Sequence, residues 1–222
     1  MLYIVSTPIG NLKDITYRAV EILKTVDLIA AEDTRHTGIL LKHYGIQTPQ
    51  TSYFEHNKVK KADTLIQLLK EGKNIALVTD AGTPGISDPG YHLIHLTQEN
   101  QIPMTVIPGA TALIAALTLS VLPAHSFAFE GFLPVKSHAR RKKLEELKNE
   151  QRTLIFYESP HRLLKTLKDI EEVLNNPNVV VARELTKKFE EIRKGRTDYL
   201  ISHFSRTKPR GEFVLLVNLT KK

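Results

Sequence analysis

Cysteine is absent from the 222-residue sequence, and long apolar runs are absent as well. Without cysteine the chain has no disulfide bond, no thiolate nucleophile and no metal or iron–sulfur site ligated by cysteine. No stretch approaches the roughly 20 consecutive apolar residues that are needed to span a bilayer. The first residues also lack the basic segment and long apolar stretch of a secretory signal. We therefore expect a cytoplasmic protein that does not enter a membrane.

What the sequence does contain is typical of a soluble globular protein, with 41% hydrophobic and 25% charged residues. A chain of this length buries most of its apolar surface without metal or disulfide crosslinks. The formal net charge is +7, which favours a polyanionic partner because Lys and Arg displace condensed counterions from nucleic acid. An unspecialised basic surface explains the charge equally well, so both interpretations remain open at this point.

Short apolar runs alternate along the chain with segments of helical periodicity. Strands are expected over residues 2–6, 27–31, 74–79, 104–107, 127–131, 153–157, 179–183 and 212–219. Helices are expected over residues 16–24, 34–44, 59–71, 91–98, 111–121, 137–149, 161–174 and 198–204. Ser159 is the expected N-cap of the helix over 161–174, with Pro160 at its first position. This alternation predicts an α/β fold with mixed, mostly parallel sheets.

The best candidate for a domain boundary is the short segment over residues 122–126, which contains Pro123. We expect an N-terminal α/β domain over residues 1–121, which carries the glycine-rich loops, and a C-terminal α/β domain over residues 122–222. Because the connecting segment is short, the two domains should touch and leave a cleft between them.

Three glycine-containing segments directly follow expected strands, at residues 7–12, 79–90 and 107–112. Open α/β sheets bind small molecules at the carboxyl ends of their strands, where glycine lets the backbone approach a ligand closely. The segment over 79–90 is the most informative, since its three glycines and two prolines specify one long loop that loses little entropy on binding. Each of the other two segments, taken alone, is an ordinary turn before a helix.

Charged side chains concentrate in the strand-to-helix turn over residues 31–37, which contains Glu32, Asp33, Arg35 and His36. Asp33 or Thr34 suits the N-cap of the following helix, but a cap does not require Arg35 and His36 beside it. Further polar groups follow later strands, at 156–162 and 182–187. The strongest local positive charge belongs to Lys136, His138, Arg140, Arg141, Lys142 and Lys143. A solvated helix face explains any single one of these cations just as well.

Seven of these segments occur in an order that resembles one family. They read TPIGNL, AEDTRHT, TDAGTPGISDPG, IPGATA, EGFLP, FYESPHR and ARELTKKFEE, and they cover essentially the whole chain. Together they are similar to the branch of the tetrapyrrole methylase superfamily that 2′-O-methylates a cytidine in the decoding centre of small-subunit ribosomal RNA. Thr79 stands where serine is usual in that branch, and Ser6 stands where a small residue or proline is usual; both departures are mild.

The resemblance implies a fold of two α/β domains that hold S-adenosylmethionine in the cleft between them, in a homodimer. Matched segment by segment, it also implies which residues approach this cofactor. They are Pro8, Gly10, Asp80, Ala81, Gly82, Thr83, Ile86, Thr111, Ala112, Phe156, Tyr157, Glu158, Leu185 and Thr186. The implied partner is the RNA of the small ribosomal subunit.

The expected reaction needs no metal, because the sulfonium donor carries its own activation. The protein must align the donor methyl group with the ribose oxygen. A general base should assist, since a ribose hydroxyl is a poor nucleophile. The first candidates for this base are Glu32, Asp33 and His36, and the second are Glu158, His161 and Lys187. The sequence does not decide among them.

Substrate RNA is expected to lie over the basic helix and to place a phosphate on Arg35. The residues expected to contact it are Arg35, Arg140, Arg141, Lys142 and Lys143. Two other functions remain open: methylation of a tetrapyrrole carbon or a modified protein side chain, and RNA binding that uses the cofactor without turnover. A nicotinamide-dependent oxidoreductase is disfavoured, because no GxGxxG with a downstream acidic residue follows the first strand.

Overall fold

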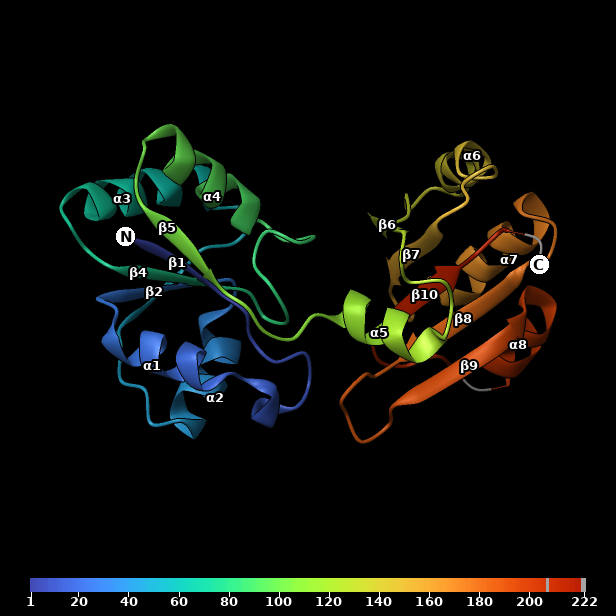
Figure 1. Ribbon diagram of the computed structural model, residues 1–222, viewed down its shortest axis with the longest axis horizontal. Coiled ribbons are helices and arrows are strands. Elements are labelled where there is room, and N and C mark those ends of the chain that lie inside the picture. Colours follow the sequence, from blue (N-terminus) through green and yellow to red (C-terminus); the bar gives the residue numbers. More distant parts are fainter. Residues whose placement is uncertain (207, 221–222) are drawn as a thin grey trace. The chain divides into compact units, whose positions relative to one another are not determined.

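The computed structural model describes residues 1–206 and 208–220 and divides into two compact units, Met1–Thr111 and Ala112–Lys222 (Figure 1). The division falls before helix α5 (Ala112–Ser120) and not after it, so the expected boundary at 121/122 is displaced. The physical reason is packing, since α5 contacts β7, β8, β9 and β10 of the second unit. Among the described residues, no helix combines the length and the apolar character needed to cross a membrane.

The first unit is built on one five-stranded sheet in the order β3-β2-β4-β1-β5. Every neighbouring pair in this sheet is parallel, as the alternation of strands and helices predicted. Its strands are β1 (Leu2–Val5), β2 (Leu28–Ala31), β3 (Gln50–Ser52), β4 (Ile75–Val78) and β5 (Met104–Ile107). The short strand β3 was not expected from the sequence.

Helices cover both faces of this sheet, with α1 and α2 on one side and α3 and α4 on the other (Figure 1). The elements are η1 (Leu12–Asp14), α1 (Tyr17–Thr25), α2 (Thr34–His43), α3 (Lys58–Lys70) and α4 (Gly90–Glu99). Each face has its own core: Leu23 and Leu41 belong to one cluster, Leu65 and Leu93 to the other. Burial on both faces explains why central strands such as β4 are apolar throughout.

The second unit is built on another five-stranded sheet, in the order β6-β7-β10-β8-β9. Only the pair β6–β7 is parallel there, so the expectation of mostly parallel pairing fails for this sheet. Its strands are β6 (Phe127–Phe132), β7 (Thr153–Glu158), β8 (Asn178–Arg183), β9 (Glu191–Arg196) and β10 (Phe213–Val217). The unexpected element is β9, which pairs antiparallel with β8 at the edge of the sheet, while β10 pairs antiparallel with the other side of β8.

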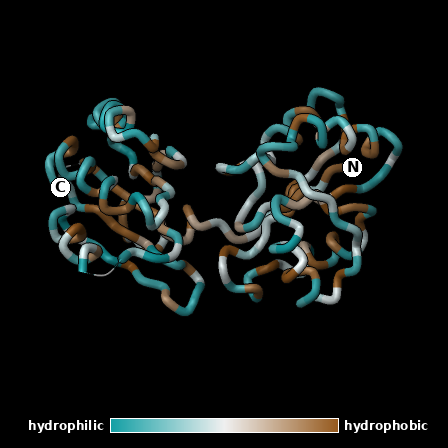
Figure 2. Tube along the Cα trace, turned by 180° about the vertical axis from the view of Figure 1, so that it is seen from behind, coloured by the Kyte–Doolittle hydropathy of each residue, from teal (hydrophilic) through white to brown (hydrophobic). Residues whose placement is uncertain are grey.

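Three further helices complete the second unit: α6 (Ser137–Glu146), α7 (Leu163–Val173) and α8 (Thr197–Ser205). Its core gathers apolar side chains of the strands and of these helices, among them Phe156, Leu167 and Leu215. Figure 2 shows hydrophobic residues concentrated toward the middle of each unit. Helix α7 begins later than expected, because the amides of Arg162 and Leu163 both donate to the backbone carbonyl of Ser159. The N-cap is therefore Arg162, and the Ser159 side chain makes no cap.

Candidate active site

The glycine-containing loops after β1 and β4 are hydrogen-bonded to each other. The Thr7 amide donates to the Gly82 carbonyl at 2.9 Å, and the Gly82 amide donates back to the Thr7 carbonyl at 3.2 Å. The hydroxyls of Ser6 and Thr83 form a further bond of 2.8 Å. Gly82 has φ of 89°, a backbone conformation that L side chains rarely adopt. Two of the predicted cofactor loops thus form one rigid ledge at the carboxyl ends of neighbouring strands.

The loop after β5 approaches the same ledge. A Cβ atom built on Gly109 would lie 2.9 Å from the Cβ atom of Ser6, a distance at which one of the two segments must shift. Only glycine therefore fits where the third loop passes the first. The structure brings together the three segments that the sequence placed separately, at 7–12, 79–90 and 107–112.

A pocket of about 110 Å³ opens beside this ledge. Its lining contains three predicted cofactor residues, Pro8, Gly10 and Asp80, and one predicted catalytic residue, His36. Ala81 and Ile86 are exposed and lie outside the lining. Pockets that enclose a drug-sized ligand usually measure about 300–1,000 Å³, so this pocket takes only part of such a ligand. Glycine at position 10 and the small side chains of Thr7 and Thr79 leave the backbone open to it.

The turn after β2 resolves the open question about Asp33. Asp33 is the N-cap of α2, and its Oδ1 atom accepts from the Arg35 amide at 2.8 Å. Its carboxylate also holds the Arg35 guanidinium, at 3.1 Å to Nε and 2.7 Å to Nη2. These bonds hold the pKa of Asp33 far below its ordinary range. The side chain of Arg35 is nonetheless 89% exposed and remains accessible to an anion.

Glu32 and Asp80 lie side by side because β2 and β4 are parallel neighbours with Ala31 opposite Val78. The Oε2 atom of Glu32 accepts from the Thr79 hydroxyl at 2.5 Å and from the Asp80 amide at 3.2 Å. The Oδ1 atom of Asp80 accepts one bond, from the Asp33 amide at 3.2 Å. Burial and then the negative charge of Glu32 raise the pKa of Asp80. Nothing in the sequence indicated that the Thr79 hydroxyl would donate a hydrogen bond to Glu32.

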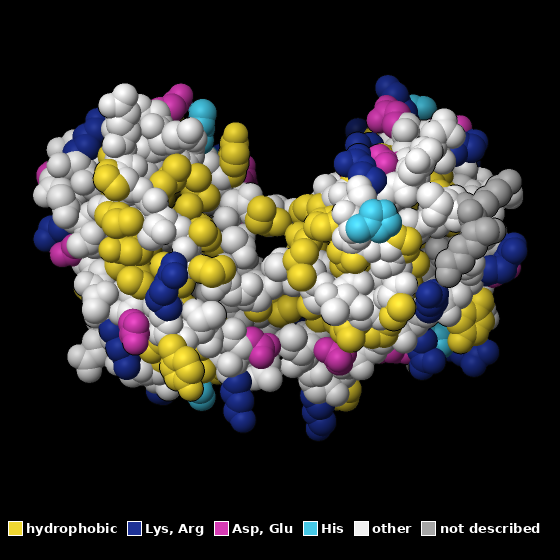
Figure 3. Space-filling model, viewed as in Figure 1, with side chains coloured by type: hydrophobic (Ala, Val, Ile, Leu, Met, Phe, Trp, Pro, Cys, Tyr) yellow, Lys and Arg dark blue, Asp and Glu magenta, His cyan; other side chains and the backbone are white. Residues whose placement is uncertain are grey.

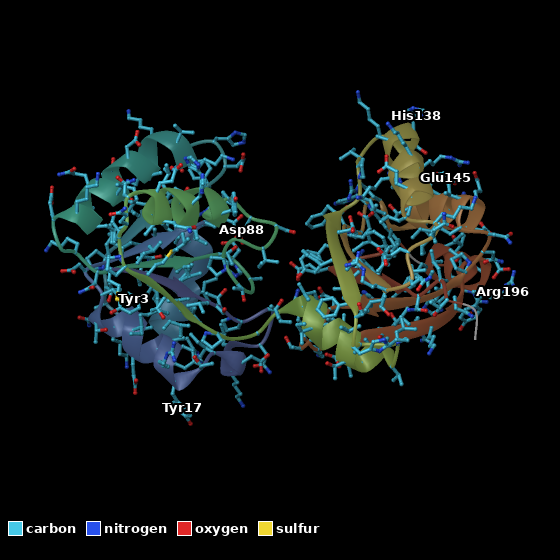
Figure 4. The ribbon with its side chains drawn as sticks, turned by 45° about the horizontal axis from the view of Figure 1, so that its top comes forward. Tyr3, Tyr17, Asp88, His138, Glu145 and Arg196 are labelled. Carbon is cyan, nitrogen blue, oxygen red and sulfur yellow. The ribbon has the colours of Figure 1, made fainter. Side chains whose placement is uncertain are left out.

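Asp88 shapes the long loop that follows β4. Its carboxylate accepts from the Gly85 amide at 2.9 Å and from the Gly90 amide at 2.7 Å. Gly85 has φ of 88°, and a Cβ atom on Gly90 would lie 2.7 Å from Asp88 Oδ1. Figure 4 labels Asp88 on this loop of the first unit. The carboxylate therefore folds the loop back on itself, which fixes the segment that the sequence singled out.

In the second unit, Phe156 and Glu158 do not present free side chains. Phe156 is fully buried in the core. Glu158 is also buried, and it accepts from the Ser159 amide, from Arg162 Nε at 2.9 Å and from the Thr166 hydroxyl at 2.5 Å. A carboxylate with this many donors stabilises the start of α7. Neither cofactor contact nor base catalysis by Glu158, both expected from the sequence, fits this environment.

The segment after β8 contains Thr186, which has an unusual backbone conformation and an unpartnered hydroxyl. Thr186 has φ of 67°, a strained conformation for a β-branched residue. Its hydroxyl oxygen is buried and has no hydrogen-bond partner among the described residues, although buried polar groups nearly always have one. A ligand with a hydrogen-bonding group would satisfy this atom. Leu185 beside it is buried, while Lys187 is paired with Glu184 at 2.9 Å and with Glu212 at 2.8 Å.

The other predicted residues of this part of the chain are half-buried or exposed. The Tyr157 ring contacts the rings of Phe129 and Phe132, with centroid separations of 4.8 and 5.7 Å. His161 is exposed, and Thr111 and Ala112 are partly exposed where the two units are connected in the chain. Their roles toward a ligand stay predictions.

The basic helix α6 does not present all its cations to solvent. Arg140 is 2% exposed; it pairs with Asp169 at 2.6 Å and donates to the carbonyls of Pro134 and Val135. The expectation that Arg140 contacts RNA is wrong for this reason. Arg141 pairs with Asp169 and Glu172, and Lys143 pairs with Glu130 at 2.8 Å. Figure 3 shows Lys and Arg side chains at the upper end of the second unit, where α6 lies.

The family model of tetrapyrrole (corrin/porphyrin) methylases matches residues 1–200. The chain is 54% identical over 218 residues to the ribosomal RNA small subunit methyltransferase I of Synechocystis sp., covering 98% of the chain and 78% of that protein. It is 48% identical to the protein of the same name from Thermotoga maritima, covering 98% of the chain and 97% of the relative.

Solved structures with the same fold are more distant in sequence. A diphthine synthase aligns with a TM-score of 0.77 and 12% identity, covering 98% of the chain and 88% of that structure. The uroporphyrin-III-C-methyltransferase of Thermus thermophilus aligns with a TM-score of 0.69 and 20% identity, covering 98% and 94%. At these identities the likeness concerns the fold alone.

Proposed function

The chain belongs to the tetrapyrrole methylase family, and on that premise we propose that it methylates the 2′-hydroxyl of a cytidine in the decoding centre of small-subunit ribosomal RNA. It is a methyltransferase, and its methyl donor is S-adenosylmethionine, as in the rest of the family. Each unit, taken by itself, carries a feature that suits a ligand. In the first unit Gly10 lines the pocket, and in the second the Thr186 hydroxyl has no partner among the described residues.

The choice of RNA as acceptor is supported by the relatives and by charge. Curated proteins about half identical to this chain are named for ribosomal RNA of the small subunit. The formal net charge of +7 suits a polyanionic substrate. Arg35, whose side chain is 89% exposed beside the pocket residue His36, is available to bind a phosphate. We include in the proposal that the protein acts in the cytoplasm as a homodimer, the form that the family resemblance implies.

One observation supports the choice of a ribose oxygen: two side chains that can accept a proton, Asp80 and His36, line the pocket of the first unit beside Pro8 and Gly10. A ribose hydroxyl loses its proton with difficulty, so its methylation gains from a nearby base. The chain's own residues would bind the substrate, align its hydroxyl and receive the proton. The donor supplies an electrophilic methyl group.

The test uses alkaline hydrolysis of the methylated RNA. Small ribosomal subunits that lack modification are incubated with the protein and S-adenosylmethionine labelled in the methyl group. A 2′-O-methyl group removes the nucleophile of alkaline cleavage, so the label should appear in an alkali-resistant dinucleotide whose first nucleoside is cytidine. Label in a mononucleotide would show base methylation and overturn the ribose assignment. Label in a porphyrin precursor but not in RNA would overturn the RNA assignment.

Binding of the donor can be tested separately from turnover. S-adenosylhomocysteine should raise the melting temperature of the protein, because a ligand that prefers the folded state stabilises it. The shift should be smaller in a Thr186→Val variant if the unpartnered hydroxyl contacts the ligand, because one hydrogen bond is lost. A size measurement at several protein concentrations tests the proposed homodimer.

A further inference from the structure

Three carboxylates meet where β2 and β4 end, and they differ in what already engages them. Glu32 and Asp33 follow β2, and Asp80 follows β4. The parallel register of the two strands sets Glu32 opposite Thr79 and Asp33 opposite Asp80. The sequence favoured Glu32, Asp33 and His36 as candidates for the general base, whereas the contacts of the three carboxylates point to Asp80.

Glu32 and Asp33 are occupied by structural bonds. The Thr79 hydroxyl and the Asp80 amide both donate to Glu32 Oε2. Asp33 caps α2 and holds the Arg35 guanidinium with both oxygens. A carboxylate with so low a pKa as Asp33 is a weak proton acceptor, because general bases work best when their pKa lies near the operating pH. Neither residue lines the pocket.

Asp80 has the opposite properties. Asp80 lines the pocket together with His36, and its carboxylate accepts one hydrogen bond, from a backbone amide. No described cation forms an ion pair with it. The negative charges of Glu32 and Asp33 raise the pKa of Asp80, whereas His36 and the hydrogen bond from the Asp33 amide lower it, and Arg35 lies within electrostatic range. Burial is the largest influence and also raises the pKa.

We propose that Asp80 is the general base that accepts the proton of the ribose 2′-hydroxyl, and that Glu32 is a positioning residue for it. This proposal rests on the proposed function. The new oxygen–carbon bond forms as the carbon–sulfur bond of the donor breaks, with its electron pair left on sulfur. The hydroxyl proton passes to an oxygen of Asp80, so that the sulfonium cation, the alcohol and the Asp80 carboxylate give a thioether, a methyl ether and a neutral carboxyl group.

Glu32 acts through Asp80 in two ways. Its carboxylate holds the backbone of Thr79 and Asp80 at the end of β4, which fixes the direction of the Asp80 side chain. Its negative charge also makes the neighbouring carboxylate a stronger base, since like charges disfavour ionisation. His36 lines the same pocket as Asp80.

The experiment measures methyl transfer to unmodified small subunits under single-turnover conditions, for the intact chain and matched variants. Asp80→Asn should lower the rate constant by about 10²- to 10⁴-fold, the usual contribution of a general base, while S-adenosylhomocysteine and subunits still bind. Asp63→Asn, which makes the same change on an exposed part of α3, should match the wild type. If Asp33→Asn loses turnover and Asp80→Asn keeps it, the assignment is overturned.

A pH profile separates positioning from a purely structural role. The wild-type rate should rise with pH through an apparent pKa above that of an ordinary aspartate. Glu32→Gln keeps hydrogen-bond acceptance by its amide oxygen but removes the charge, so this limb should move to lower pH. An unmoved limb overturns the role of Glu32. A wild-type protein that methylates no RNA overturns the proposed function as well, whereas an active wild type with an equally active Asp80→Asn variant overturns only the base assignment.

Discussion

The Thr79 hydroxyl donates a hydrogen bond of 2.5 Å to the carboxylate of Glu32 and thereby joins the ends of two parallel strands. Glu32 follows β2 and Thr79 follows β4, 47 positions later in the chain. The bond keeps a negative charge beside Asp80, and no described lysine or arginine forms an ion pair with Glu32. Charge-assisted hydrogen bonds are shorter and stronger than neutral ones, and a hydroxyl donor brings no positive charge that would cancel that of the carboxylate.

The first prediction concerns this bond. Thr79→Val removes the donor while nearly preserving shape, so the Glu32 carboxylate keeps only the Asp80 amide. Because hydrogen bonds to charged groups contribute about 1.5–3 kcal/mol, the free energy of unfolding in urea should fall by that amount. Thr79→Ser retains the hydroxyl and serves as the control. Equal stabilities of the valine and serine variants would contradict the importance of the bond.

The second prediction follows from the raised pKa of Asp80. In the unfolded chain Asp80 loses its proton near the ordinary aspartate value, and in the folded protein it does so at higher pH. Between these two values the folded state binds more protons, so this group lowers stability as pH rises through the window. Asp80→Asn cannot titrate and should therefore be more stable than the wild type above the window.

This advantage of Asp80→Asn should shrink toward zero as pH falls below the ordinary aspartate value, because both forms are then neutral. Urea unfolding at a series of pH values measures it, with the exposed Asp63→Asn variant as the control for the change of charge. A stability difference that stays constant with pH would contradict the cause given for the shift. A residue that costs stability while lining a pocket is typical of a functional group.

Much of the fold could be predicted from the sequence, because strongly apolar segments leave few alternatives. Strand β10 lies within the expected 212–219 range and is buried along its whole length. Strand β9 escaped prediction because its sequence, EIRKGR, is polar and its residues are exposed or half-buried at the edge of the sheet. Its pairing with β8 comes from backbone hydrogen bonds, which leave little trace in the pattern of side chains.

The sequence predicted only those features of the site that depend on residues close together in the chain. The glycine loops and the charged turn were visible, because the special φ of Gly82 and the cap of Asp33 depend on nearby residues. The sequence could not predict which of Glu32, Asp33 and Asp80 has the fewest hydrogen bonds. That outcome depends on the pairing of β2 with β4 in the sheet. Arg140 and Lys142 look alike in sequence, but Asp169, 29 positions from Arg140, makes one of them a core residue.

The third prediction concerns that buried ion pair. Arg140→Ala leaves the Asp169 carboxylate buried with only the Ser137 hydroxyl and the half-exposed Arg141 as partners. Breaking a buried pair costs about 3–5 kcal/mol, so unfolding in urea should occur at much lower denaturant concentration. The double variant Arg140→Met, Asp169→Leu should recover most of the loss, since no buried charge remains. A single variant as stable as the wild type would contradict the structural role of Arg140.

The fourth prediction assigns RNA contact to Lys142, which is exposed on α6 and forms no ion pair with any described residue. Each phosphate that a lysine neutralises releases counterions, and the slope of log K against log salt changes by about 0.7–0.9 per contact. Lys142→Ala should reduce the steepness of that slope for small-subunit binding by about this amount, without changing stability.

Lys70→Ala is the matched control, because Lys70 is equally exposed at the end of α3 in the first unit. It removes the same positive charge from the chain, so any effect of net charge alone should appear in both variants. If Lys142→Ala weakens binding equally at every salt concentration, or if the two variants flatten the slope alike, Lys142 makes no phosphate contact. A difference between them would instead place RNA against the exposed side of α6, with Arg140 beneath it holding the helix in position through Asp169.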